Sequence, residues 1–468
     1  MQSARLFTPP GPRGRSILGS LPDLSRDRLG FLTHVAQQYG DVVKYRIATF
    51  RLVQVNHPDA IQHVLQENNH NYTKNSPTLR EFRRVLGSGL FTSEGAFWLR
   101  QRRLMQPAFH RQRIAALGEM MVNATQAMLE TWQPAIPSGQ PLDISGEMMA
   151  LAMEIACRAL FSADIQPHVQ EIGQAVTAIV EEVMFRFDHP FYPSPAFPTP
   201  RNRHYRAAMQ ALDRIAYGLI QQRRRQPVEG GDLLSLLMEM RDEDTNEGMT
   251  DQQLRDEVVT LLIAGHETTA TALSWTFYLL SQNPLAEQRL RLELDQVLSG
   301  RLPSAADLPS LPYTRRVIDE SMRLYPPAWV TERIAEGDDE ICGYAIPAGT
   351  IVVVSPYVMH HHPAYWENPE SFDPQRFLPE RAAGRPRYAY FPFGGGPRMC
   401  IGNSLALTEA QLLLATITQR YHLELATDPP VEPLPLVTLR QKGGLWMRVQ
   451  KALPSPNIRR ELVGEEIA

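Results

Sequence analysis

One long apolar stretch, residues 250–281, limits more than any other feature what this chain can fold into. Thr250 is a favoured N-cap residue, Asp251 follows it, and the later apolar residues cover most of a helix circumference. A helix that is apolar on all sides must be buried, and at ~1.5 Å per residue it would cross the whole molecule. The sequence therefore predicts a large helical protein built around one buried helix, which Asn283 and Pro284 end.

Helical patterns dominate the rest of the chain, and few stretches alternate as strands do. A helix is expected from Ser25 or Asp27 to Tyr39, and the β-branched segment 42–55 predicts a hairpin with a turn near Ala48. Further helices are expected at 58–66, 98–106, 111–132, 145–161, 202–224, 284–298, 313–324 and 404–420, and a short buried strand at 351–355. The predicted fold class is mainly α with small β-sheets (α+β).

The chain of 468 residues could hold about three domains of ~150 residues, but no sequence feature marks a boundary. No Gly/Ser linker, low-complexity run or internal repeat divides it, and the 38 prolines are spread between helical patterns. Pro-rich patches at 9–12 and 190–200 predict a stiff lead-in and a surface loop. We expect a Pro-rich lead-in (1–24), one large domain (25–450) and a C-terminal tail (451–468).

Composition excludes several classes of protein. A net charge of -4 with 43% hydrophobic residues does not fit a disordered chain and argues against nucleic-acid binding. Cys157, Cys342 and Cys400 are too few and too far apart for a disulfide scaffold. No stretch reaches the ~18 apolar residues of a membrane span, and the start lacks the apolar core of a signal peptide. We expect a cytoplasmic, monomeric protein without a transmembrane anchor.

A glycine-rich loop carries one cysteine directly before a helix, in the segment Phe393-Gly394-Gly395-Gly396-Pro397-Arg398-Met399-Cys400-Ile401-Gly402. Its glycines allow tight turns and a close approach to something flat. The helix N-terminus and Arg398 favour a thiolate at Cys400. A thiolate is a soft metal ligand, and on haem iron it donates the electron density that favours O–O cleavage. The alternative is a turn around a buried, inert cysteine.

The loop resembles the haem-ligand pattern of the cytochrome P450 family, Phe-x-x-Gly-x-Arg-x-Cys-x-Gly. Phe393, Gly396, Arg398, Cys400 and Gly402 fill its five fixed positions. The resemblance implies a haem b cofactor (iron protoporphyrin IX), with Cys400 as the iron ligand, Phe393 beside the sulfur and Arg398 on a haem propionate. It also implies a single domain in which a long central helix lies over the haem and the cysteine loop beneath it.

A charged pair on the helix expected at 313–324 matches a second pattern of the family. Glu320 and Arg323 stand at i and i+3, and the family completes this pair with an arginine that Arg376 supplies. An exposed pair of this kind contributes only ~0.2–0.5 kcal/mol, whereas breaking a buried one costs ~3–5 kcal/mol. The resemblance therefore implies a structural network that supports the cysteine loop.

Trp98 and Arg102 stand at i and i+4 and match a Trp-x-x-x-Arg pattern of the family. The plain alternative is an amphipathic surface helix with a basic face. The resemblance implies that both residues face haem propionates, which suits a guanidinium because it binds carboxylates with two parallel hydrogen bonds. Arg333 is a further propionate candidate by the same resemblance.

The middle of the long helix contains Ala264, Gly265, His266, Glu267 and Thr268. Small residues at 264 and 265 would let a flat ligand approach the backbone, and a threonine hydroxyl can bond to the carbonyl one turn earlier. The family pattern (Ala/Gly)-Gly-x-(Asp/Glu)-Thr is met here. It implies that Thr268 hydrogen-bonds the oxygen being activated, that Glu267 helps to deliver protons, and that Ala264 and Gly265 border the haem. His266 is expected to be a structural or solvent-facing residue.

The acid and the alcohol together favour reductive dioxygen activation, because family members that use peroxides commonly lack this pair. The resemblance implies insertion of one oxygen atom into a C–H or C=C bond, while the other leaves as water. Two rival readings stay open: a haem-thiolate protein without oxygenase activity, such as an isomerase or sensor, and a helical binding module without a cofactor. The three consecutive histidines 360–362 predict a turn and no metal site, since adjacent positions cannot all face one ion.

The electrons are expected from a separate ferredoxin or flavodoxin and its reductase, because no flavin or iron–sulfur module follows the last helix. Two sets of arginines are expected to flank the cysteine side and to dock an acidic partner: Arg100, Arg103, Arg111, Arg113, Arg381, Arg385 and Arg387. The substrate is expected to be apolar, a fatty acid or a terpenoid. The expected pocket residues are Phe91, Phe185, Phe187, Ala264, Thr268, Pro327, Ala328 and Val330.

Overall fold

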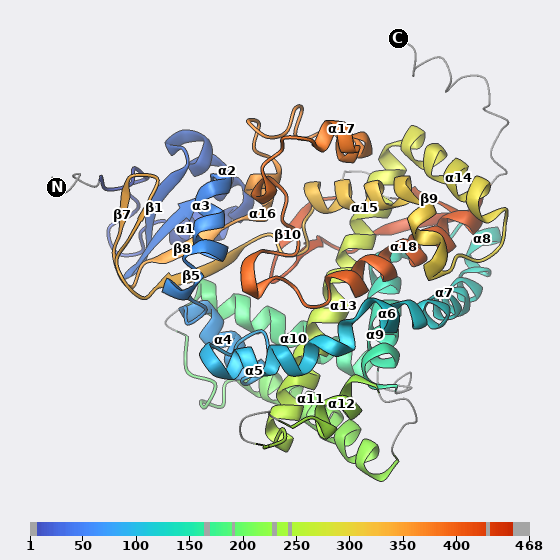
Figure 1. Cartoon of the computed structure of the whole chain (residues 1–468), viewed down its shortest axis with the longest axis horizontal. Helices are drawn as coiled ribbons and strands as arrows, with labels where there is room; N and C mark the ends of the chain where they lie inside the picture. Colours follow the sequence, from blue (N-terminus) through green and yellow to red (C-terminus); the bar gives the residue numbers. More distant parts are fainter. Residues whose placement is uncertain are drawn as a thin grey trace.

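The helix expected at 250–281 is α13 (Asp251–Gln282) in the computed structural model, which describes residues 7–162, 169–189, 192–226, 232–241, 246–426 and 431–452. Thr250 caps it, and the Thr250 and Gln253 side chains each bond the other residue's backbone N–H in a capping box. Most of α13 is buried, and it runs through the helical part of the molecule, packed against α9 (Ile144–Phe161) (Figure 1). The prediction of a buried central helix is confirmed.

The other helices surround α13 or connect it to the sheets. The remaining α-helices are α1 (Leu21–Arg26), α2 (Arg28–Tyr39), α3 (Pro58–Gln62), α4 (Pro77–Leu86), α5 (Gly95–Met105), α6 (Arg111–Ala116), α7 (Gly118–Trp132), α8 (Ala135–Ser138), α10 (Val169–Asp188), α11 (Pro200–Arg225), α12 (Leu233–Glu239), α14 (Pro284–Leu298), α15 (Pro312–Leu324), α16 (Pro356–His360), α17 (Pro379–Ala382) and α18 (Asn403–Arg420). Short 3-10 helices are η2 (Asn69–Asn71), η3 (Gln106–Phe109), η5 (Ala305–Ser310), η6 (Pro374–Phe377), η7 (Arg387–Ala389) and η8 (Gly396–Arg398), and η1 (His63–Glu67) is a π-helix.

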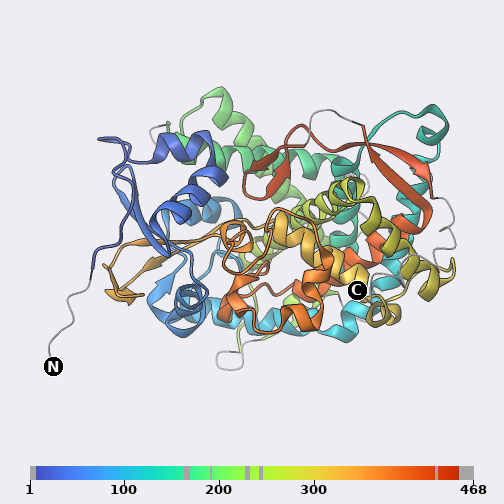
Figure 2. The same cartoon turned by 90° about the horizontal axis from the view of Figure 1, so that it is seen from above.

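Within the described ranges, four small sheets complete the fold, so the predicted class of mainly α with small β-sheets is confirmed. The strands are β1 (Val42–Ile47), β2 (Phe50–Val55), β3 (Tyr72–Thr73), β4 (Leu142–Asp143), β5 (Thr331–Ala335), β6 (Asp339–Ile341), β7 (Tyr344–Ile346), β8 (Ile351–Val354), β9 (Tyr421–Leu425), β10 (Pro433–Pro435), β11 (Leu439–Gln441) and β12 (Trp446–Lys451). The five-stranded sheet has the order β1-β2-β8-β5-β3, and the sheet β4-β12-β9 lies at the opposite end of the molecule (Figure 2).

The predicted hairpin at 42–55 is confirmed: β1 pairs with β2 in antiparallel register, with Ile47 opposite Phe50. Its turn contains Ala48, whose φ is 49°. β2 then pairs with β8 in parallel register, with Val53 beside Val352, so the strand expected at 351–355 lies inside this sheet. The all-buried pattern of β8 fits its central place in the sheet.

The apolar core lies on both sides of α13. One cluster joins the second half of α13 to α7, α14, α15 and α18, with Trp275 stacked on Tyr325 at 3.8 Å between ring centroids. A second cluster joins the first half of α13 to α9, α10, α11 and α12. Because α13 contributes to both clusters, it fixes the relative position of the parts that carry the site described below.

Several predicted elements differ in their bounds. The single helix expected at 111–132 is two helices, broken at Leu117; a Cβ at the next residue, Gly118, would lie 3.3 Å from Ala305 Cβ, so the chain packs closely here. The helix expected at 58–66 ends as the π-helix η1. The turn expected at 360–362 is the end of α16. The helices α4 and α10 were not predicted.

Some predictions fall partly outside the described residues: the start of the loop at 190–200, and residues 453–468 of the expected tail. In the part of the chain that the structure describes, no helix has the length and apolar character needed to cross a membrane. Cys157, Cys342 and Cys400 are all unpaired within the same described ranges, as their spacing predicted.

Candidate functional site: the cysteine loop and the central helix

Two hydrogen bonds shape the cysteine loop, which lies between η8 and α18. The backbone N–H of Cys400 donates to the Phe393 carbonyl at 3.0 Å, and that of Met399 donates to the Gly396 carbonyl at 3.1 Å. Phe393 itself is partly buried and packs against the core cluster that contains α18. The loop is thus closed on itself by backbone bonds and held on a core residue at its start.

The glycines of the loop are required by the protein around them. A Cβ on Gly396, whose φ is +64°, would lie 1.8 Å from the Leu65 carbonyl oxygen, and one on Gly395 would lie 2.3 Å from the Tyr388 ring. The expectation that all these glycines make room for a flat group is therefore wrong at both positions, since the loop packs against η1 and η7 there. At Gly402 an added Cβ would only reach ordinary contact with Phe109 and the Cys400 sulfur.

The Cys400 side chain is exposed, but the surrounding protein screens its sulfur from bulk water. This desolvation raises the pKa of the thiol, whereas the Gly402 backbone N–H, Arg102 and Lys74 act to lower it. The expected influence of Arg398 on the sulfur is wrong in part: Arg398 donates to Glu94 at 2.6 Å, and Arg102 is the arginine that acts on the thiol.

Four cations gather beside the cysteine loop: Lys74, Arg102, Arg333 and Arg398. Desolvation lowers the pKa of each, and that of Arg333 falls to about 10. Three of them, Lys74, Arg333 and Arg398, also repel one another. Lys74 was not predicted, because a lone lysine outside any motif carries no signal in the sequence.

The cations are held by backbone and side-chain bonds. Arg102 Nη1 donates to the Met399 carbonyl at 3.0 Å, and Lys74 Nζ donates to the Phe91 carbonyl at 2.9 Å. Arg398 lies 4.0 Å above the ring of Trp98, which places the predicted Trp98 in the cluster as well.

One buried donor in this cluster remains without a partner. Arg398 Nη1 has no hydrogen-bond partner among the described residues. An unpaired buried donor is costly, and concentrated positive charge needs an anion. The donor set therefore fits a group with two carboxylates next to the sulfur of Cys400, as the propionates of haem would be.

The predicted charged network forms as expected. Arg323 donates to Glu320 through Nε at 2.7 Å and Nη2 at 2.8 Å, and Arg376 Nε donates to Glu320 at 3.2 Å. Glu320 and Arg323 are fully buried. Burial raises the pKa of Glu320, while Arg323 and Arg376 act to lower it. These bonds join α15 to η6, and the geometry is that of a buried, fully paired carboxylate.

The network also reaches towards the cysteine loop. Arg323 donates to the carbonyls of His360 and Pro369, and His360 Nε2 accepts the backbone N–H of Phe391 at 3.1 Å. Tyr390 donates to the Asp319 carbonyl on α15 at 2.9 Å. The segment just before the loop is therefore fixed by side chains of α15 and α16, and His360 has a structural role there.

One turn of α13 is more open than the rest. Ala264 is exposed and Thr268 is partly buried, although the residues on either side of this turn are mostly buried. The Thr268 hydroxyl donates to the Ala264 carbonyl at 2.8 Å, which confirms the predicted bond to the preceding turn. Gly265 differs from its expected place: a Cβ there would lie 3.6 Å from Ala156 Cβ on α9, so this side of the helix is used for packing.

Glu267 is buried and paired by residues that sequence reasoning missed. Its Oε1 accepts from Thr438 Oγ1 at 2.5 Å and from Arg440 Nε at 2.7 Å. Both donors come from the β10–β11 hairpin, more than 170 residues away, and no motif connects them to α13. His266 is also buried, so it is not a solvent-facing residue.

The predicted pocket residues divide into two groups. Ala328 and Phe91 are exposed. Val330 and Phe187 are partly buried, and both pack against one further core cluster, separate from the two on either side of α13. Phe185, in contrast, stacks on His189 at 4.1 Å with Arg201 above its ring, so it belongs to a surface aromatic cluster.

The turn of the β10–β11 hairpin borders the region of the predicted pocket residues Ala328 and Val330. Trp329 donates to the Leu436 carbonyl at 2.8 Å, and Leu436 and Val437 pack against the cluster that contains the first half of α13. This hairpin was not predicted as part of the pocket, since its short strands show no clear alternation.

Comparison with known proteins assigns these features to one family. A family model, Cytochrome P450, matches residues 9–447. The chain belongs to the cytochrome P450 family. This P450 is 39% identical over 413 residues to cyclooctat-9-en-7-ol 5-monooxygenase of Streptomyces melanosporofaciens, with 88% of each chain covered.

Two further relatives cover almost the whole P450 chain. Pentalenene oxygenase of Streptomyces avermitilis is 34% identical over 446 residues, which span 95% of this chain and 97% of the relative. The crystal structure of the cytochrome P450DA haem domain matches with a TM-score of 0.86 at 28% identity, covering 96% of this chain and 99% of that one. The predicted family and fold class are therefore confirmed.

Membership of the family establishes the reaction class of this P450. It is a monooxygenase that uses haem iron, dioxygen and electrons from a redox partner to oxidise an apolar organic substrate. The residues described above fit that cofactor, because they combine one accessible cysteine with a cluster of cations that calls for carboxylates.

The arginines expected to dock the redox partner do not all remain available. Arg381 donates to Asp373 at 2.9 Å, and Arg385 lies 3.9 Å above the Trp366 ring while donating to the Arg376 carbonyl. Arg103 and Arg111 are exposed, as is Arg387 on η7. Arg113 and Arg381 are exposed as well, so most of the predicted arginines lie at the surface.

Proposed function

We propose that this P450 hydroxylates a C–H bond, or oxidises a C=C bond, of a terpenoid hydrocarbon. The balanced reaction combines the substrate, dioxygen, two electrons and two protons to give the oxygenated product and water. The names of the two bacterial relatives, a monooxygenase of a terpene alcohol and an oxygenase of pentalenene, support the substrate class. Small accessible residues at the open turn and after α15, Ala264 and Ala328, leave room for a bulky hydrocarbon.

The cofactor in this proposal is haem b, bound through its iron by the Cys400 thiolate. Bound haem supplies the iron on which dioxygen is reduced. Arg102, Arg333, Arg398 and Lys74 hold its two carboxylates, Trp98 supports Arg398 from below, and Phe393 and Gly402 flank the sulfur. Glu320, Arg323 and Arg376 keep the segment before the loop in place and do not touch the cofactor.

Thr268 and Glu267 have separate roles in delivering the two protons that the reaction consumes. The Thr268 hydroxyl keeps its proton on the Ala264 carbonyl and can turn it towards the open side of α13. Glu267 holds a carboxylate next to it on the same helix, and Arg440 and Thr438 fix the position of Oε1. A proton reaches the open side from solvent through these two groups. Ala264 lines that side and limits how closely the substrate approaches.

The single observation that carries the proposal is the Thr268 hydroxyl bonded to the Ala264 carbonyl on the one accessible turn of a mostly buried stretch of helix, beside an acid. The test is Thr268→Ala in the holoenzyme, supplied with NADPH, a ferredoxin and its reductase. We expect most electrons to appear as peroxide, and product per NADPH to fall by about tenfold or more, since positioned proton donors contribute ~10²–10⁴-fold.

Thr276→Ala is the matched control. Thr276 lies on the same helix and makes the same bond, to the Ala272 carbonyl at 2.8 Å, but it is fully buried. This variant should keep the normal ratio of product to NADPH. Equal coupling in Thr268→Ala and the parent enzyme would contradict the proposed proton path.

The electron donor in this proposal is a separate acidic ferredoxin or flavodoxin that docks at Arg103, Arg111 and Arg387. Attraction between exposed charges is screened over ~10 Å at 0.1 M salt. Raising the salt concentration should therefore slow reduction by the partner protein but not by dithionite. A rate that does not change with salt would remove this docking proposal while leaving the reaction class intact.

A further inference from the structure

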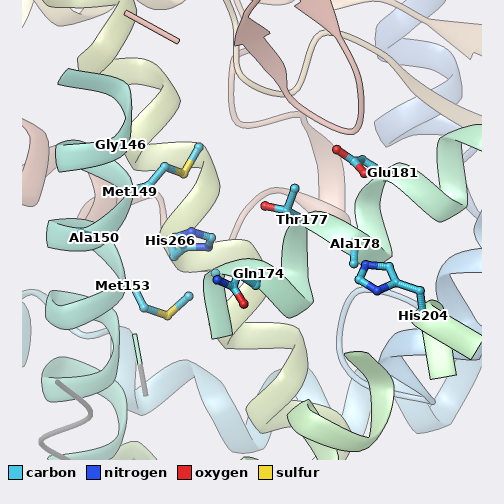
Figure 3. A pocket seen from close by; sticks show the side chains of 11 residues that line it. Gly146, Met149, Ala150, Met153, Gln174, Thr177, Ala178, Glu181, His204 and His266 are labelled. Atoms are coloured by element: carbon cyan, nitrogen blue, oxygen red, sulfur yellow. The ribbon is translucent and has the colours of Figure 1, made fainter. Parts of the chain in front are cut away.

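A cavity of about 710 Å³ lies between α9, α10 and α13, outside the site described above (Figure 3). Met149, Ala150 and Met153 of α9 form one wall, and Gln174, Thr177 and Ala178 of α10 form the other. His266 of α13 closes the inner end, and His204 of α11 and Glu181 border the cavity as well. Ligand cavities of small molecules have volumes of ~300–1,000 Å³, so this one is large enough.

The cavity is separate from the open turn that carries Ala264 and Thr268. Successive residues of an α-helix are rotated by ~100°, so His266 leaves α13 about 160–200° away from those two residues. The same turn of α13 therefore presents the proposed oxygen site on one side and this cavity on the other. A molecule bound here would not compete for the space beside Ala264 and Thr268.

His266, which closes the inner end of the cavity, has an unsatisfied polar atom. The residue is 4% exposed, and its Nδ1 is buried without a hydrogen-bond partner in the described part of the chain. Burial lowers the pKa of His266 to about 4, although Glu267 nearby acts to raise it, so the ring is neutral near pH 7. A neutral imidazole offers one donor and one acceptor, which suits a hydroxyl group.

The walls select for a molecule that is mostly apolar. Met149 and Met153 have flexible, polarisable side chains that adapt to irregular hydrocarbon surfaces, and Ala150 and Ala178 keep the cavity open. Gln174, Thr177, Glu181 and His204 supply further polar groups on the α10 and α11 side. An ion of either sign would not find a cluster of opposite charge, since the lining combines a single carboxylate with two histidines.

We propose that this cavity is a second binding site for a hydroxylated hydrocarbon, with the hydroxyl on His266 and the carbon frame on Met149 and Met153. This is the chemical class of the product in the proposed function, on which the identification of the ligand rests. The site would allow product to bind while substrate occupies the space beside Ala264 and Thr268.

The experiment measures binding of farnesol, a hydroxylated isoprenoid, to the holoenzyme by isothermal titration calorimetry and by the haem absorption spectrum together. Farnesene, which lacks the hydroxyl, is the matched ligand. We expect two equivalents of farnesol, one of which leaves the haem spectrum unchanged, and one equivalent of farnesene at the same concentrations. The absence of any farnesol equivalent that leaves the haem spectrum unchanged, or a silent equivalent of farnesene of the same affinity, overturns the proposal, and the space is then a water-filled cavity only.

Two variants locate the silent equivalent. Gly173→Leu places a side chain into the cavity, because Gly173 lines it and a Cβ there meets nothing within 4 Å. Gly218→Leu on α11 is the matched control, since a Cβ on Gly218 also meets nothing within 4 Å but this residue does not line the cavity. We expect loss of the silent equivalent in the first variant and no change in the second.

His266→Phe should weaken the silent equivalent about tenfold, because the hydroxyl loses its buried partner. Silent binding that survives Gly173→Leu overturns the site whatever the outcome of His266→Phe. The readout is independent of turnover: an enzyme that forms no oxygenated product but binds the silent equivalent contradicts the proposed function alone, and normal turnover without a silent equivalent contradicts this inference alone.

Discussion

The two sides of the proposed cofactor site are built in different ways. On the cysteine side, Glu320 is fully buried and accepts four hydrogen bonds, and the loop before Cys400 is closed by backbone bonds. On the α13 side, Thr268 donates to a carbonyl of its own helix, and Glu267 is held by a hairpin from the far end of the chain. The first arrangement suits a fixed ligand, and the second keeps polar groups that can change partners during a reaction.

The largest expected effect comes from breaking the cysteine side. Glu320→Ala leaves Arg323 buried without its carboxylate, which costs about 3–5 kcal/mol of folding free energy. We expect a protein that retains little haem or does not fold, as measured by denaturant unfolding and by haem content after purification.

Lys442→Ala is the control for that experiment, because Lys442 and Glu432 form an ion pair that is exposed on both partners. This variant should unfold at the same denaturant concentration as the parent protein. A Glu320→Ala protein with parental stability and full haem content would show that the network does not support the cysteine loop.

A smaller effect is expected on the α13 side, from Arg440. Arg440→Met removes one of the two donors to Glu267, so the buried carboxylate keeps only Thr438. We expect a loss of stability of about 1–3 kcal/mol and a clear fall in product per NADPH, with haem content unchanged.

Arg440→Lys retains the charge and should restore most of the coupling. Arg440 is a positioning residue in this account, so the ratio of product to peroxide should move more than the affinity for substrate. If both variants form as much product per NADPH as the parent enzyme, the bond from Arg440 to Glu267 is not needed for catalysis. The contrast between the two sides of the site then becomes weaker.

Whether a feature of the site could be predicted from the sequence depends on how far apart along the chain its interacting residues lie. The cysteine loop, the Glu320 pair and the Thr268 bond involve residues within one short segment or helix, and the sequence predicted all three. Lys74, Thr438 and Arg440 act across long stretches of chain, so no local pattern indicates them. Gly265 faces α9, and His266 lines the cavity between α9, α10 and α13. Both placements depend on how α13 is rotated about its axis, which only packing determines.

The last effect is on the pH dependence of stability and comes from Glu409 on α18, a buried carboxyl. Its Oε1 lacks a partner in the ranges that the structure describes, and burial raises its pKa to about 8. The folded protein then binds a proton that the unfolded chain, with a pKa near 4.5, releases earlier. Stability should therefore fall as the pH rises from about 4.5 to 8.

Glu409→Gln removes this titration and should flatten the pH dependence, so the variant should be more stable than the parent protein at pH 8 and differ little from it at pH 4.5. Urea unfolding at a series of pH values measures the difference. The same slope in both proteins would mean that the Glu409 carboxyl reaches a partner or water in the folded state.

The central claim is that the sulfur of Cys400 binds the haem iron, and the absorption spectrum of the reduced holoenzyme under carbon monoxide tests it most directly. A thiolate ligand gives the long-wavelength band that haem proteins with nitrogen ligands lack. We expect this band in the parent protein and in Cys342→Ser, whose cysteine is exposed and far from the site in sequence, and its loss together with all activity in Cys400→Ser. A parent protein with the short-wavelength band, or a Cys400→Ser protein that keeps the long-wavelength band and its activity, would contradict the account.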